Sequence, residues 1–145
     1  MATAALTQVM TAEEITDFLQ EVYPGAIDHF TIEDVGPMTA RVRMPIGPGR
    51  LRPGGTVSGP ALMTVADLTM WVALLGMIGP RALSVTVNMN IDFLRKPGPT
   101  DVIADAHLLK VGKRLAVGTV TMRSDGDDRP VAHASVTYAV PSDDA

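Results

Sequence analysis

The chain has 145 residues, a formal net charge of −4 at pH 7 and no cysteine. This length suits one domain, and because 46% of the residues are hydrophobic but only 4% aromatic, aliphatic side chains and methionine must fill its core. Without cysteine, disulfides, thiolate metal sites and cysteine nucleophiles are excluded. The acidic balance argues against a general nucleic-acid-binding protein. The start of the chain lacks the pattern of a signal peptide, so we expect a cytoplasmic protein.

The N-terminal part predicts a helix followed by a hairpin. Thr11 and Glu14 form a capping box, and apolar residues at helical spacing continue to about Val22. A strand is predicted over about 27–35 and a second over 39–45, with a Gly-Pro turn between them. Residues 46–57 are rich in glycine and proline and are expected to form a loop, either a plain connector or a carrier of binding groups.

The stretch from Ser58 to Met77 predicts a long helix that is apolar on every side. Ser58 suits the N-cap, and proline is tolerated in the first turn. Asp67 is the one charged side chain between positions 53 and 80. A carboxylate among apolar side chains is costly unless it is paired or hydrogen-bonded. Asp67 is therefore interpreted either as a catalytic or ligand-binding group, or as a residue that caps a nearby loop or reaches solvent.

The length of this helix would also allow a membrane span. Asp67 opposes that alternative, since a charge at the bilayer centre is expensive. The flanking segments have the alternation of amphipathic strands, which favours a helix buried in a soluble fold over a membrane protein.

Four strands are predicted after the helix. Residues 84–93 alternate strictly, with an apolar face and a polar but mostly uncharged face that suits an interface or a site, although a solvated face is an alternative. Strands over 102–111, 115–123 and 131–140 follow, joined by short turns. We therefore predict an α+β domain spanning residues 1–145, with its core in about 26–140. An antiparallel sheet of about six strands wraps round the central helix of about 58–77, preceded by an N-terminal helix.

Three segments within about residues 47–140 resemble the hot-dog fold, and specifically its PaaI-like branch of acyl-CoA thioesterases. They are SGPALMTVADLTM (58–70), SVTVNMNIDFLRKP (84–97) and LLKVGKRLAV (108–117). The first is similar to the helix start that carries the catalytic Asp, the second to a strand ending in an Asn-x-x-Phe-Leu-Arg-Pro pattern, and the third to a hairpin with a basic tip. Their order and spacing together carry the resemblance.

The resemblance implies roles for particular residues. Asp67 would be the nucleophile or general base, the backbone N–H of Gly59 would polarise the thioester carbonyl, and Thr86 would help to orient the attacking water. The substrate would be a small aromatic or aliphatic acyl-CoA, so coenzyme A enters as part of the substrate and no cofactor is expected. A homodimer or dimer of dimers is implied. The residues expected to bind substrate are Arg52, Ser58, Asn88, Arg95, Lys96, Lys110, Lys113 and Arg114.

Two positions depart from the family pattern. Ser58 stands in place of the family's histidine, and Arg52 in place of its loop asparagine. These departures leave open a non-catalytic acyl-CoA-binding or sensing domain on the same fold. A hot-dog hydratase ranks lower, because position 72 is Val where that branch places a histidine. The three histidines, His29, His107 and His133, show no metal-ligand spacing, so no metal site is predicted.

Overall fold

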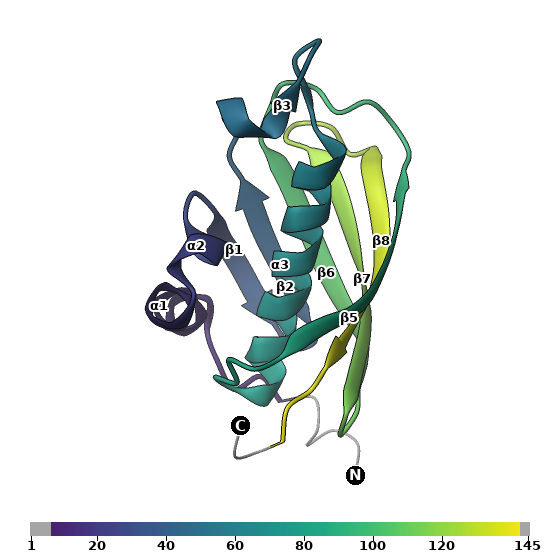
Figure 1. The fold of residues 1–145 in the computed structure, drawn as a ribbon. Helices are drawn as coiled ribbons and strands as arrows, with labels where there is room; N and C mark the ends of the chain where they lie inside the picture. Colours follow the sequence, from purple (N-terminus) through teal and green to yellow (C-terminus); the bar gives the residue numbers. More distant parts are fainter. Residues whose placement is uncertain (1–6, 143–145) are drawn as a thin grey trace.

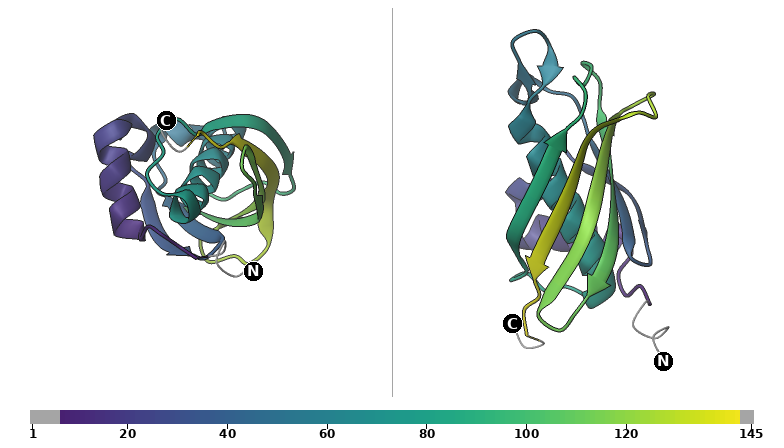
Figure 2. Two further views of the ribbon diagram at one scale, coloured as in Figure 1. Left: turned by 90° about the horizontal axis from the view of Figure 1, so that it is seen from below. Right: turned by 90° about the vertical axis from the view of Figure 1, so that its right-hand side faces the viewer.

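The apolar helix α3 (Gly59–Ile78) lies along the concave face of a six-stranded antiparallel sheet in this computed structural model, which describes residues 7–142. Residues 1–6 and 143–145 of the predicted domain lie outside the described residues. Seen along α3, the sheet curls round the helix, and α1 covers a flank that the sheet leaves open (Figure 2). This is the predicted hot-dog arrangement.

The strand order in the sheet is β1-β2-β6-β7-β8-β5, so β1 and β5 are its edges. Its strands are β1 (Thr31–Gly36), β2 (Thr39–Met44), β5 (Val85–Phe93), β6 (Val102–Val111), β7 (Leu115–Ser124) and β8 (Pro130–Ala139). Short turns join β6, β7 and β8, which pair antiparallel in sequence. The long connection through α3 carries the chain to the far edge, where β5 pairs with β8.

Helix α3 forms where its sequence predicts it. The Ser58 hydroxyl accepts a hydrogen bond from the Ala61 N–H at 3.2 Å, and Gly79, with φ 91°, ends the helix. Within residues 7–142 it is the one helix long and apolar enough to cross a membrane, but 72% of its most apolar window is buried inside the protein. Its apolar character is therefore that of a core helix, and the membrane alternative is not needed.

The N-terminal elements agree with prediction except at one junction. Helix α1 (Ala12–Val22) has the predicted capping box, and its Ile15 and Leu19 are fully buried. The strand expected from residue 27 begins only at Thr31, because Pro24–Ile27 forms the short helix α2. Proline suits the first turn of a helix, and Pro24 is the first residue of α2. His29, with φ 68°, then lies in the turn between α2 and β1.

The predicted loop of residues 46–57 contains local structure. A 3₁₀ turn (Pro48–Arg50) leads into a small two-stranded hairpin, β3 (Leu51–Arg52) with β4 (Thr56–Val57). Gly54 and Gly55 both have positive φ at its tip, a conformation that glycine adopts without steric cost. The hairpin delivers the chain directly to Ser58 and the start of α3.

The expected alternation of residues 84–93 is broken by a β-bulge. The register of β5 against β8 shifts between Thr86 and Asn88, which leaves Val87 without a direct partner. A bulge exchanges the two faces of a strand on one side of the extra residue. Val85 and Val87, predicted on the inner face, are therefore 56% and 55% exposed, while Thr86 turns towards α3.

Candidate active site

Asp67 lies at the middle of α3 on the side that faces β5 and β8, and its side chain is half-buried. Its Oδ1 accepts two hydrogen bonds, one from the Thr86 hydroxyl at 2.5 Å and one from the Tyr138 hydroxyl at 2.8 Å. These donors compensate the carboxylate for the water that it loses on burial. The Asp67 carboxylate is thus held in place on one oxygen and is reachable from outside.

Tyr138 is a member of this site that the sequence did not reveal. It is only 3% exposed, and burial, followed by the nearby Asp67 charge, raises the pKa of Tyr138 far above its usual value. It is therefore a neutral hydroxyl donor at neutral pH. The available signal was its type, because a buried tyrosine hydroxyl needs a hydrogen-bond partner. Nothing in the sequence pairs it with a residue 71 positions away.

The bulge in β5 is what brings Thr86 to Asp67. Thr86 and Tyr138 are direct cross-strand partners, so their side chains emerge on the same face of the sheet. Without the extra residue at position 87, Thr86 would share the outward face of Asn88 and Asn90. The structure thus unites Asp67 and Thr86, two of the three expected catalytic residues.

The third expected catalytic residue, Gly59, is the first residue of α3. Helices leave their first backbone N–H groups without partners inside the helix. Here Ser58 accepts the Ala61 N–H through its side chain and the Leu62 N–H through its carbonyl, and Pro60 has no N–H. Among the described residues, nothing accepts the Gly59 N–H. This amide, at the positive end of the helix dipole, is available to a carbonyl oxygen.

Gly59 opens onto a hollow of about 620 Å³ between the start of α3 and the end of β5. Three expected substrate-binding residues, Arg52, Arg95 and Lys96, line it together with Phe93. An anionic group in this hollow would meet three cations and a helix N-terminus. The wall also contains apolar surface, from Val57, Pro60, Leu62 and Pro97.

The other expected substrate-binding residues lie elsewhere in the chain. Ser58 lines a different hollow at the helix start, together with His29 and Arg50, and its hydroxyl serves as the N-cap. Asn88 is exposed on the outer face of β5 and accepts a hydrogen bond from Asn90. Lys110 is exposed near the end of β6, and Lys113 and Arg114 form the β6–β7 turn beside Arg81 and Val140. That turn lies at the end of the molecule where α3 finishes, so one chain does not bring the two basic groups together (Figure 1).

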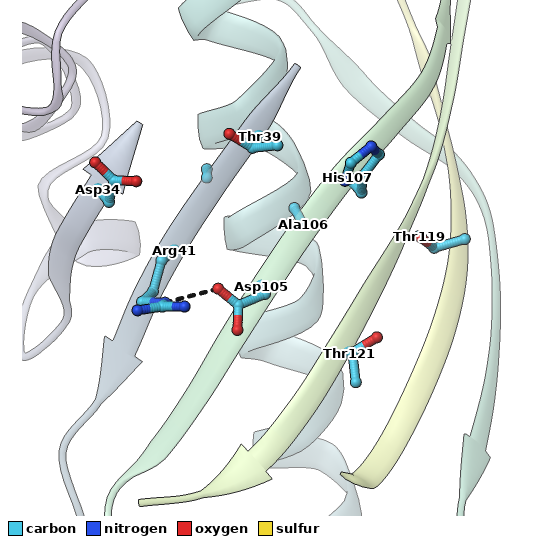
Figure 3. A pocket seen from close by; sticks show the side chains of 9 residues that line it. Asp34, Thr39, Arg41, Asp105, Ala106, His107, Thr119 and Thr121 are labelled. Carbon is cyan, nitrogen blue, oxygen red and sulfur yellow. Dashed lines mark hydrogen bonds and ion pairs between the residues drawn. The ribbon is translucent and has the colours of Figure 1, made fainter. Parts of the chain in front are cut away.

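The outer face of the sheet is polar and separate from Asp67. A hollow of about 390 Å³ on this face holds His107, Thr119 and Thr121 beside the Arg41–Asp105 ion pair, whose Nε to Oδ1 distance is 2.7 Å (Figure 3). His133 contacts Thr121 at 3.1 Å on the same face. No group of three or more potential metal-ligating side chains occurs within residues 7–142.

Gly59 and Asp67 are separated along one continuous helix. Eight residues at about 1.5 Å each put them about 12 Å apart along the axis. A donor to a carbonyl oxygen and a group attacking its carbon must lie within roughly 3–3.5 Å of the reacting atoms. Gly59 and Asp67 of the same chain therefore cannot act on the same carbonyl.

Comparison with known proteins identifies the family. The profile of the Thioesterase superfamily matches residues 54–138. The solved structure of a candidate thioesterase from Silicibacter sp. TM1040 is 36% identical, over 94% of this chain and 96% of that one, with a TM-score of 0.87. A candidate esterase from Thermoplasma acidophilum is 24% identical over 77% of this chain and 83% of its own length.

More distant structures share the fold. Zebrafish thioesterase superfamily member 2 is 19% identical, over 92% of this chain and all of that one, with a TM-score of 0.80. A mutant of the phenylacetic acid degradation protein PaaI from Thermus thermophilus is 22% identical, over 86% of this chain and 99% of that one, with a TM-score of 0.67. The present chain belongs to the thioesterase superfamily and is a thioester hydrolase with the hot-dog fold.

Proposed function

We propose that this protein is an acyl-CoA thioesterase of the PaaI-like branch, acting on a small aromatic or aliphatic acyl-CoA. The observation that carries the proposal is the Asp67 carboxylate, which is accessible on one oxygen and held on the other by Thr86 and Tyr138. Hydrolysis of a thioester needs such a group together with a donor for the oxyanion. The unpartnered Gly59 N–H supplies that donor.

The proposed reaction can proceed by either of two routes. As a general base, Asp67 takes a proton from water while the water oxygen attacks the thioester carbon. As a nucleophile, it attacks the carbon itself, and water then hydrolyses the resulting anhydride. In both routes the Gly59 amide binds the oxyanion and the C–S bond breaks. The departing thiolate of coenzyme A takes its proton from the protonated Asp67 in the first route and, in the second, from the water that hydrolyses the anhydride. The oxygen of the Thr86 hydroxyl retains lone pairs that can orient the attacking water.

The hollow beside Gly59 is the proposed entry for coenzyme A. Arg52, Arg95 and Lys96 supply positive charge for its phosphates in a protein that is acidic overall. Coenzyme A is then part of the substrate, and the mechanism uses no separate cofactor or metal. Arg52, which stands where the family pattern described above has asparagine, adds a positive charge to the hollow that Gly59 also lines, so we expect it to influence the acyl preference.

We propose that the active protein is a homodimer or a dimer of dimers. Strand β5 is a sheet edge, and an exposed edge can pair with a second copy. Exposed apolar side chains gather along it, including Val85, Val87 and, on the neighbouring helix, Met63. If two α3 helices lie antiparallel across a twofold axis, the Gly59 end of one faces the Asp67 region of the other.

The same twofold symmetry would bring the two separate groups of basic residues close to each other. Lys113 and Arg114 lie at the end of the molecule where α3 finishes. Beside an antiparallel partner, that end adjoins the start of the partner's helix. Lys110, Lys113 and Arg114 of one subunit would then join Arg95 and Lys96 of the other around the same coenzyme A.

We assign this activity to the cytoplasm, with no nucleic-acid or membrane partner.

Steady-state turnover of a panel of acyl-CoAs tests the proposal. The panel should contain short, medium and long aliphatic chains and aromatic acyl groups, with release of free thiol as the readout. We expect a clear preference within the panel. Tight binding of acyl-CoA without turnover of any member would instead support the non-catalytic binding function and contradict the proposal.

A further inference from the structure

The two carboxylate oxygens of Asp67 differ in the hydrogen bonds that they accept. Both side-chain donors, Thr86 and Tyr138, reach Oδ1, and the Tyr138 hydroxyl also lies 3.1 Å from the Asp67 backbone carbonyl. Within residues 7–142, no hydrogen bond to Oδ2 is found. One oxygen is thus fixed to the sheet and the other faces the accessible side.

We propose that Tyr138 is a positioning residue of this thioesterase, which with Thr86 anchors Oδ1 of Asp67 so that Oδ2 is the oxygen that reacts. The inference rests on the proposed function, because it gives Tyr138 a role in the same reaction. It adds a residue and an atomic assignment that the function itself does not require. Tyr138 does not touch substrate in this scheme and acts only through Asp67.

The fold makes this anchor rigid. Thr86 and Tyr138 are cross-strand partners on β5 and β8, and both donate from the sheet to a helix residue. An aspartate side chain on a helix can otherwise rotate about two bonds, which would turn the oxygen without donors away from its accessible position. Two donors on one oxygen remove that freedom, and small errors in the placement of a reacting group cost large factors in rate.

The first test is Tyr138→Phe, which deletes only the hydroxyl. We expect kcat to fall roughly 10- to 100-fold, the range for loss of a hydrogen bond to a charged group, with KM for acyl-CoA nearly unchanged. The matched control is Tyr23→Phe, since Tyr23 is the other tyrosine of the chain and is 57% exposed.

A second test needs no turnover. In the Tyr23→Phe background, biosynthetic 3-fluorotyrosine labels Tyr138 alone, and its ¹⁹F resonance reports the surroundings of the Tyr138 hydroxyl. The resonance should shift in Asp67→Asn, which alters the partner of that hydroxyl, and stay in place in the control Asp92→Asn. Thr86 offers a parallel pair, in which Thr86→Ser keeps the donor and most of the activity, whereas Thr86→Val loses both. These measurements remain decisive even if Tyr138→Phe does not fold.

The outcomes of these tests distinguish failure of the role proposed for Tyr138 from failure of the proposed thioesterase function. An active wild-type enzyme whose Tyr138→Phe variant keeps kcat, or whose ¹⁹F resonance is the same in Asp67→Asn, overturns the role of Tyr138 alone. A wild-type protein that hydrolyses no thioester overturns the proposed function, and with it the positioning role of Tyr138, even if the ¹⁹F resonance reports the contact.

Discussion

Asp67 combines an energetic cost of burial with the catalytic role that we propose for it. A carboxylate on an apolar core helix loses hydration, and two hydroxyl donors at 2.5 and 2.8 Å compensate for part of that loss. Two neutral donors leave the negative charge in place, whereas an ion pair would have neutralised it. That arrangement suits a base or a nucleophile better than a structural salt bridge.

Asp67→Asn should remove most hydrolysis and preserve the fold. The amide is nearly isosteric but cannot accept a proton or attack as an anion, and loss of a catalytic base typically costs ~10²–10⁴ in rate. Activity should be measured on the best acyl-CoA, with a melting curve for each protein. Asp92→Asn, on the outer face of β5, is the matched control and should turn over normally. Wild-type turnover by Asp67→Asn would refute the assignment.

Gly59 offers a matched pair of variants. Gly59→Pro removes the backbone N–H, and we expect kcat to fall by ~10²–10³, as when an oxyanion donor is lost. Proline suits this first helical position, and the extended ψ of 154° at Ser58 suits a residue before proline. Gly59→Ala keeps the N–H, and its Cβ would meet Phe93 at an ordinary 3.5 Å. If the alanine variant loses as much kcat as the proline variant, the amide is not the donor.

The residues of the site differed in how far sequence could place them. Asp67 stands out because no other charge occurs on its helix, and Ser58 because it precedes an apolar run as an N-cap. Tyr138 carries no such signal, since its role depends on a contact between chain positions 67 and 138. A local pattern cannot encode a pairing that only the folded sheet creates.

At the scale of elements, β5 shows what the alternation of apolar and polar residues can predict and what it cannot. Its alternation correctly predicts a strand, found over Val85–Phe93. The same alternation wrongly places Val85 and Val87 on the inner face, because the bulge inserts one residue against β8. The alternation of apolar and polar residues does not reveal where a strand contains a bulge. This bulge adjoins Thr86, the residue that β5 contributes to the candidate site.

The contact of α3 with β7 predicts a stability effect. A Cβ at Gly118 would lie 2.8 Å from the His107 carbonyl oxygen and 2.9 Å from the Met70 sulfur. Gly118→Ala should therefore lower the free energy of unfolding by about 1–3 kcal/mol, as overpacking does. The control is Gly98→Ala, where no atom lies within 4 Å of the added Cβ. Urea unfolding of both measures the difference, and equal stabilities would contradict the packing described.

The two groups of basic residues near the ends of α3 predict effects on the binding of acyl-CoA. Neutralising Lys113 and Arg114 with glutamine, or Arg95 and Lys96 in the same way, should raise KM for acyl-CoA and change kcat little, because contacts to distant phosphates act as uniform binding. Both effects should shrink in high salt. Arg41→Gln on the outer face is the control for net charge. An unchanged KM, or an equal loss with a short thioester that lacks the nucleotide, would place coenzyme A elsewhere.

At the scale of the whole molecule, hydrophobic periodicity was enough to predict the architecture. A helix without a polar face needs a sheet that wraps it, and the six strands supply that sheet. The distribution of function over the molecule was not predictable in the same way. The basic residues near 95 and 113 were all expected to bind substrate, yet within one subunit they lie near opposite ends of α3 (Figure 1).

Oligomeric state follows from that separation. One chain offers the Gly59 amide and the Asp67 carboxylate about 12 Å apart along α3, so in the proposed mechanism a complete site requires a second copy. Light scattering at micromolar concentration should therefore report a dimer or a tetramer. A monomer that hydrolyses acyl-CoA at the full rate would contradict the shared site.

The most direct measurement of the shared site is complementation between Asp67→Asn and Gly59→Pro. Each homodimer should be nearly inactive. In a mixed dimer, one site receives both defects and the other receives neither, so activity should return to as much as half of the wild-type value. Dimers carrying one copy of each variant, isolated with two different affinity tags and shown to be folded, give the answer. If such dimers recover no activity, each site is built within one chain and the account is wrong.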